Sequence, residues 1–244
     1  MSSFKRVFNI KSILFAGIVL RLVFMIWGAP IYYGTPDYAT KGGDTHAWVE
    51  SMKNLVHTGT YTADPNYEDG KFFRPPGYSL FLLPFYLISG FNLGTMYLIV
   101  QLIQVLLDSI AIWLVYKIVK NINGPEEIAL LSSFFYCIYP FSIVWAPYLY
   151  AEAPSVFFLL LSIFLITKSK HWTSFLFAGI ALGFAVLLRV QIIFAALAFT
   201  YYLFKEYKSI KHFFTAPCIY FFIAFGITYG SWPARNMMYG KFID

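Results

Sequence analysis

Two carboxylates at the edges of apolar segments are the first residues of this sequence that could do chemistry. Asp44 follows Gly42-Gly43 and opens a stretch with helical spacing, whereas Glu152 stands where one apolar segment ends and the next begins. A carboxylate within hydrogen-bond reach of a hydroxyl group can act as a general base. Two structural alternatives remain open: Asp44 as the N-cap of a helix, and Glu152 as a solvated residue at the rim of a span.

Asp44, His46 and Glu152 are weak candidates for metal ligands. Asp44 and His46 form an Asp-x-His pair, but a divalent ion needs further ligands that the sequence does not indicate. A plain surface histidine is the alternative for His46. A divalent metal therefore stays an open question, and no cofactor is certain.

Four cations stand where they could bind an anion. Arg74 lies in the Pro-Pro turn of residues 72–78 and follows Lys71, whereas Arg189 and Arg235 fall at helix ends on the outer side of the predicted topology. Cations on that side run against the positive-inside rule and need an anionic partner, which a lipid or substrate phosphate would supply. Interfacial anchoring of Arg74 and a stop signal at Arg235 are the alternatives.

Arg21 and Asp108 are two charged residues inside apolar segments. Charges at such depth are costly and are usually paired or functional. We predict a mutual ion pair between them, and a transport relay, which normally needs more such residues, is the alternative.

The composition places these residues in a membrane protein. Hydrophobic residues make up 59% of the 244-residue chain and charged residues 12%, against about 45–50% and about 25% in soluble domains. The net charge of +6 comes from Lys and Arg residues scattered between apolar segments, which form no patch for nucleic acid. The sequence therefore excludes a soluble domain and a nucleic-acid partner. It predicts the lipid bilayer as a partner of the protein.

About seven of eight apolar segments are predicted to span the membrane. The segment 76–91 is short and contains Pro84, so we expect an interfacial or partly inserted helix there. When this segment does not cross, the lysine groups between the spans all lie on the cytoplasmic side. The eight segments are 12–29, 76–91, 94–118, 128–147, 153–167, 172–188, 190–204 and 213–232.

The predicted fold is an all-α membrane protein made of a single transmembrane domain, residues 1–244. Its N-terminus is cytoplasmic, and residues 30–75 form a large outer loop 1 with short helices. The turn 148–152, the connection at Arg189 and the segment after Trp232 face the same side. We expect a multi-pass protein of the cytoplasmic (inner) membrane with its active face outside.

Several short motifs, in their order and spacing, resemble the GT-C superfamily of polyprenyl-phosphate-sugar-dependent glycosyltransferases. The similarity is to the branch of protein O-mannosyltransferases and aminoarabinose transferases. It departs from the family at Val190, where proline is expected, and in the reversed order Trp232-Pro233. The matching pieces are Gly43-Asp44, Arg74-Pro75-Pro76-Gly77-Tyr78, Tyr150-Ala151-Glu152, Leu187-Leu188-Arg189 and Trp232-Pro233-Ala234-Arg235.

The resemblance implies that Asp44 and Glu152 are catalytic and that Arg74 and Arg189 contact the substrate phosphate. Lys71 and Arg235 are further candidates for binding the phosphate. The implied reaction moves a sugar, with inversion, from a polyprenyl-phosphate donor to an acceptor protein, lipid or glycan. Members usually continue with further spans, so the chain would be the N-terminal part of a longer protein. A small transporter or flippase and a truncated scaffold without catalysis remain as alternatives.

Overall fold

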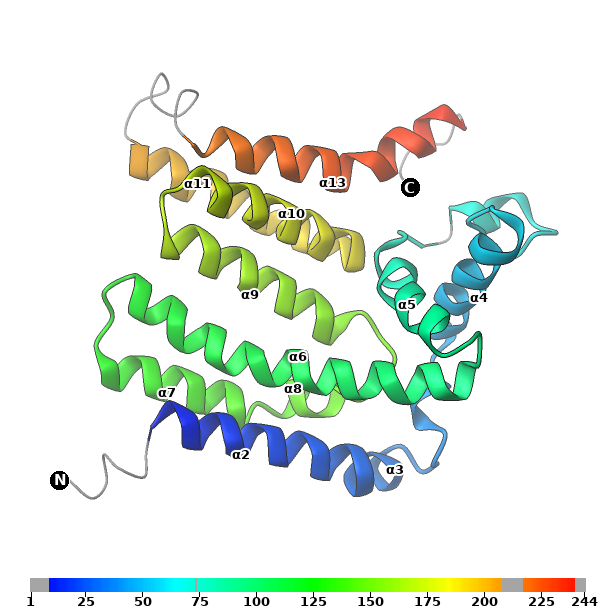
Figure 1. Cartoon of the computed structure of the whole chain (residues 1–244), viewed down its shortest axis with the longest axis horizontal. Helices are drawn as coiled ribbons and strands as arrows, with labels where there is room; N and C mark the ends of the chain where they lie inside the picture. Colours follow the sequence, from blue (N-terminus) through cyan, green and yellow to red (C-terminus); the bar gives the residue numbers. More distant parts are fainter. Residues whose placement is uncertain (1–8, 73, 208–216, 240–244) are drawn as a thin grey trace.

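The computed structural model describes residues 9–72, 74–207 and 217–239, and every regular element in these ranges is helical (Figure 1). A π-helical turn, Phe24–Gly28, joins α2 to α3. Short 3-10 turns lie at Tyr38–Thr40, Glu68–Lys71 and Val190–Ile192. The helices are α2 (Ile10–Val23), α3 (Ala29–Tyr32), α4 (Gly43–Thr58), α5 (Gly77–Ile88), α6 (Leu93–Asn121), α7 (Glu126–Cys137), α8 (Pro140–Trp145), α9 (Glu152–Lys168), α10 (Trp172–Leu188), α11 (Ile193–Tyr207) and α13 (Ile219–Met238).

The long helices lie side by side in one bundle, with α4 and α5 at one end of it (Figure 1). Helices α10 and α13 approach closely at Gly179, where a Cβ atom would meet the Phe221 backbone. Within the described ranges, two helical stretches are long and apolar enough to cross a membrane, Ile10–Tyr32 and Leu93–Asn121. The described part of the chain is therefore helical, with two helices that could cross a membrane, and the count of seven spans stays a prediction.

The predicted segment 128–147 is not one helix but two, α7 and α8. Pro140 lacks a backbone N–H and disfavours helical geometry in the residue before it, so the helix ends at Cys137 and restarts at Pro140. Hydropathy alone does not reveal this break, because Ile138 and Tyr139 are as apolar as their neighbours.

The predicted ion pair between Arg21 and Asp108 is confirmed. Arg21 Nε donates to Asp108 Oδ2 at 2.5 Å, and both side chains are buried, at 0% and 2% exposure. The same guanidinium donates to the Cys137 carbonyl at 3.1 Å and to Ser142 Oγ at 2.9 Å. Arg21 therefore satisfies carbonyl groups that the break between α7 and α8 leaves open.

Two predicted helix ends differ from the structure. Gly42, with extended backbone geometry, is the N-cap of α4, and Asp44 lies in the first turn, so the N-cap alternative for Asp44 is wrong. Helix α13 continues past Trp232 to Met238, although Pro233 lies inside it. The apolar run stops at Trp232, but Ala, Arg and Met are good helix formers that extend the backbone hydrogen bonding.

Candidate active site

Asp44 and Arg74 form an ion pair between α4 and the segment that precedes α5. The Tyr61 hydroxyl donates to the carbonyl oxygens of Arg74 at 3.1 Å and Pro75 at 3.3 Å, which fixes the backbone that carries the arginine. Burial raises the pKa of Tyr61, so this hydroxyl stays protonated and can donate. The pair is only partly covered, with Asp44 25% and Arg74 38% exposed.

Glu152 and Arg189 form a second ion pair, between the start of α9 and the end of α10. A carboxylate in the first turn of a helix and a cation after the last turn both complement the helix dipole. About a third of each side chain is exposed, at 31% and 27%. Among the described residues, no group donates a hydrogen bond to Glu152 Oε2, although this oxygen is buried.

The two ion pairs belong to one cluster of four charges. Burial lowers the pKa of the Arg189 guanidinium, while the nearby Asp44 carboxylate raises that pKa and Arg74 lowers it further. The Tyr150 ring lies within 6.0 Å of the Arg189 guanidinium carbon and 5.6 Å from the Trp48 ring. The structure thus brings together the four charged residues that sequence reasoning placed on one side, and we refer to them as the charged cluster.

Contacts across helices keep the charged cluster in place. The N-terminus of α5 lies directly against the end of α10, where a Cβ on Gly77 would overlap the Leu187 and Leu188 backbone. A Cβ on Gly42 would overlap the Tyr150 ring in the same way. Glycine is therefore needed at both positions for the helix ends that carry the charges to approach one another.

Lys71 and Arg235 form a second group of cations, linked to each other and not part of the two ion pairs. Arg235 Nη1 donates to the Lys71 carbonyl at 2.9 Å, and its guanidinium carbon lies 4.9–5.2 Å from the ring centroids of Trp232, Phe72 and Tyr239. Tyr61 connects the two groups, because its ring packs on Trp232, 5.7 Å away between centroids, while its hydroxyl holds the Arg74 backbone.

The three weak metal candidates do not come together. His46 is exposed on α4, and no group of three His, Cys, Asp or Glu side chains in the described ranges could hold a metal ion. The donor set of the described residues therefore does not fit a resident metal.

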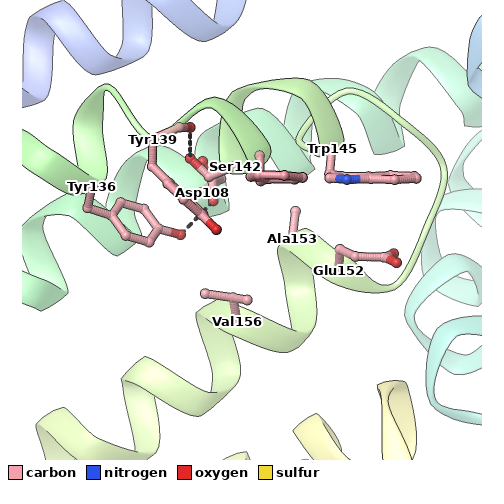
Figure 2. A pocket seen from close by; sticks show the side chains of 9 residues that line it. Asp108, Tyr136, Tyr139, Ser142, Trp145, Glu152, Ala153 and Val156 are labelled. Atoms are coloured by element: carbon pink, nitrogen blue, oxygen red, sulfur yellow. Dashed lines mark hydrogen bonds between the residues drawn. The ribbon is translucent and has the colours of Figure 1, made fainter. Parts of the chain in front are cut away.

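Sequence reasoning missed the aromatic residues around the charged cluster. Tyr150 contacts Arg189 and packs beside Trp145, and Tyr61 holds the Arg74 backbone. The signal was present as the aromatic-rich stretch Tyr148-Leu149-Tyr150 directly before Glu152. A cavity of about 190 Å³ also lies between α8 and α9 and reaches from Glu152 to Asp108 (Figure 2).

The chain matches the model of a known protein family. A family model described as dolichyl-phosphate-mannose-protein mannosyltransferase matches residues 74–232, more than half of the chain. No curated protein and no solved structure matches the chain. The matched region contains Arg74, Glu152 and Arg189, whereas Asp44 precedes it.

Proposed function

The chain belongs to the dolichyl-phosphate-mannose-protein mannosyltransferase family, and on that premise we propose that it transfers a sugar from a polyprenyl-phosphate donor to an acceptor hydroxyl. The family implies a glycosyltransferase of this general kind that acts in a membrane. The observation that carries the proposal for this chain is the charged cluster: two carboxylates and two arginines from four separate helix ends, all partly accessible. Acid–base chemistry at a hydroxyl and charge stabilisation at a phosphate need these two types of group.

In the proposed reaction, the acceptor oxygen forms a bond to the anomeric carbon of the sugar while the bond from that carbon to the phosphate oxygen breaks. Asp44 takes the proton of the acceptor hydroxyl, and the polyprenyl phosphate leaves with the bonding electron pair. Attack from the face opposite the phosphate inverts the anomeric carbon. Glu152, whose side chain is about one third exposed beside Arg189, orients the acceptor.

Arg74 and Arg189 are the proposed contacts to the leaving phosphate. A guanidinium has five N–H donors, and within the described residues Arg189 uses one of them, toward Glu152. Arg189 can therefore hold its carboxylate and a phosphate oxygen together. Lys71 and Arg235 supply a second, outlying positive charge toward the phosphate or the lipid interface.

We further propose that residues 1–244 form a single transmembrane domain of about seven spans, with loop 30–75 and the interfacial helix 76–91 on the outer face of the cytoplasmic membrane. The lysines support this orientation. Lys117 and Lys120 end α6, Lys168 ends α9 and Lys205 lies in the last turn of α11, at the bundle end opposite to α4 and α5 (Figure 1).

The test is transfer from a radiolabelled polyprenyl-phosphate mannose donor by membranes that contain the chain. We expect Asp44→Asn to lower transfer about 10³-fold, the range of a lost general base, and the matched control Asp37→Asn, at an exposed position of the same loop, to leave it unchanged. Normal transfer by Asp44→Asn would overturn the assignment of the base.

A version extended through any downstream reading frame is assayed alongside. Activity in the extended version alone would assign these residues to part of a larger catalyst. Absence of transfer in every version, with the chain folded and inserted, would contradict the proposed reaction and favour a non-catalytic membrane scaffold or a transporter.

A further inference from the structure

Tyr150 reaches both ends of the charged cluster. Its ring centroid lies 6.0 Å from the guanidinium carbon of Arg189, the proposed phosphate contact. Its hydroxyl end lies against Gly42, the N-cap of α4, where an added Cβ would overlap the hydroxyl oxygen. Asp44, the proposed base, stands in the first turn of the same helix. Tyr150 therefore extends from the group that faces the leaving phosphate toward the group that faces the acceptor.

The turn that carries Tyr150 is fixed to the neighbouring elements. The Leu149 N–H donates to the Ala39 carbonyl at 3.2 Å, and the Leu149 carbonyl accepts from Thr45 Oγ1 at 2.8 Å. The Tyr150 ring packs edge-on against the Trp48 ring, with the centroids 5.6 Å apart. The position of the phenol is therefore set by the fold before a substrate arrives, as a group that orients a substrate requires.

The Tyr150 hydroxyl keeps its hydrogen-bonding capacity for a ligand. No hydrogen bond joins it to another residue of the described ranges, and the side chain is partly exposed. Tyr33 belongs to the same group of rings, through Tyr148, but its hydroxyl donates to the Val144 carbonyl at 3.2 Å. A phenol hydroxyl can donate one hydrogen bond and accept others. Tyr150 can therefore offer a donor and an acceptor that the fold does not use.

The geometry of the proposed reaction decides which part of the donor reaches this hydroxyl. Inversion needs the acceptor and the leaving group on opposite faces of the sugar ring, so the sugar lies between the base and the leaving phosphate. The phosphate is matched by guanidinium groups, whereas a sugar hydroxyl both donates and accepts, as a phenol does. A hydroxyl that points from Arg189 toward the helix end of Asp44 therefore suits the sugar.

We propose that the Tyr150 hydroxyl binds a hydroxyl group of the donor sugar and makes the site distinguish the sugar-bearing donor from the released polyprenyl phosphate. The inference rests on the proposed function, because it concerns the donor of that reaction. The arginines alone favour the product, since a released phosphate monoester carries more negative charge than the donor diester. A contact to the sugar offsets this preference, because it is made with the donor only.

The test is the affinity of the purified full chain in detergent for polyprenyl-phosphate mannose and for bare polyprenyl phosphate. Tyr150→Phe removes one hydroxyl that bonds to no described residue, so its melting temperature should equal that of the parent. We expect the variant to bind the mannose donor about fivefold to tenfold more weakly, the range of a lost hydrogen bond. Its affinity for polyprenyl phosphate should stay unchanged. Tyr33→Phe, which removes a hydroxyl from the same group of rings, is the matched control and should bind both ligands as the parent does.

Donors that lack a single sugar hydroxyl identify the partner of Tyr150. The parent should bind one of these deoxy donors about as weakly as Tyr150→Phe binds the complete donor. Tyr150→Phe should bind that deoxy donor and the complete donor equally, because the hydrogen bond is already lost.

Two results would overturn the proposal while the proposed function stands. Equal weakening of both ligands by Tyr150→Phe would assign the hydroxyl to the phosphate or to the fold, and unchanged binding of the mannose donor would exclude the sugar contact. Binding is measured without turnover, so failure of the proposed function is recognised separately. A parent chain that shows the expected Tyr150 difference but transfers no sugar would contradict the reaction and support the sugar contact. A parent that binds neither ligand would overturn both.

Discussion

The chain uses the same arginine–carboxylate chemistry in two regions with opposite degrees of burial. In the bundle, the side chains of Arg21 and Asp108 are 0% and 2% exposed, and Arg21 donates five hydrogen bonds that include three backbone carbonyl groups. In the charged cluster, the paired side chains are 25–38% exposed, and Arg189 donates one hydrogen bond to a described residue.

This difference in burial separates charges that stabilise the fold from charges that a ligand can reach. A buried guanidinium whose donors are saturated has nothing to offer a ligand, and its removal would strand a buried carboxylate. A partly exposed pair keeps donors and acceptors that water or substrate can reach, and contributes little to folding. The bundle pair therefore maintains the helix break, whereas the charged cluster is the region suited to substrate.

Arg21→Met tests the structural side of the comparison and should have the largest effect. It leaves the Asp108 carboxylate buried without its cation and removes the donor to the Cys137 carbonyl, so we expect a loss of about 3–5 kcal/mol in the free energy of unfolding. Chemical unfolding in detergent micelles measures this. Lys11→Met, at an exposed position on the same helix, is the control and should stay within about 0.5 kcal/mol.

A double variant distinguishes a stranded charge from lost packing. Arg21→Met with Asp108→Leu removes both charges, and it should be more stable than Arg21→Met alone because no carboxylate is left unpaired. A double variant as unstable as the single one would mean that packing, and not charge pairing, makes Arg21 important.

Arg189→Met tests the charged cluster, which a ligand can reach. Because the pair with Glu152 is about one third exposed, its loss should change the free energy of unfolding by less than about 1 kcal/mol. Sugar transfer should fall about 100-fold, as expected when a donor to a developing anion is lost. Arg189→Lys keeps the charge and should lie between the two. Unfolding as severe as that of Arg21→Met would erase the distinction between the two regions.

Gly42→Ala tests how closely the charged cluster is packed, and Gly43→Ala is its neighbour control. A Cβ at Gly42 would overlap the Tyr150 ring, whereas at Gly43 no atom lies within 4 Å of the added Cβ. We expect Gly42→Ala to displace Tyr150, cost about 1 kcal/mol of stability and lower transfer roughly tenfold through misplacement of reacting groups. Gly43→Ala should match the parent, and equal behaviour of both variants would refute the close contact.

The two regions were predictable from the sequence to different degrees. The pairing of Arg21 with Asp108 follows from the cost of charge in apolar segments, since each is the natural partner of the other. The partners within the charged cluster do not follow, because loop 30–75 offers several acids and bases at similar distances along the chain. The packing of α4 against α5 brings Arg74 to Asp44, and the packing of α9 against α10 brings Arg189 to Glu152.

The contacts that the sequence did not predict join residues far apart in the chain. Arg235 lies 164 residues from the Lys71 carbonyl to which it donates, and neither residue type specifies the other. Pro140 by itself indicates a break in the helix, but the continuous hydropathy of residues 128–147 indicates a single span. Local chemistry therefore identified which residues are costly or reactive, and tertiary packing decided what they touch.

Arg235→Met is the smallest of the expected effects and tests a cation that belongs to neither region. Its loss removes one hydrogen bond to the Lys71 backbone and contacts with three rings, at a partly exposed position, so we expect less than about 1 kcal/mol of global stability to be lost. The local effect should be clearer, because the turn Glu68–Lys71 loses its attachment to α13. Trypsin cleavage after Lys71 in the purified chain should become several-fold faster, while Arg235→Lys, which keeps a positive charge and N–H donors on a shorter reach, should be cleaved at an intermediate rate. The contrary result is that Arg235→Met is cleaved at the parent rate and binds the phosphate donor more weakly. That result would assign Arg235 to substrate binding, together with the charged cluster, and not to attachment of the turn.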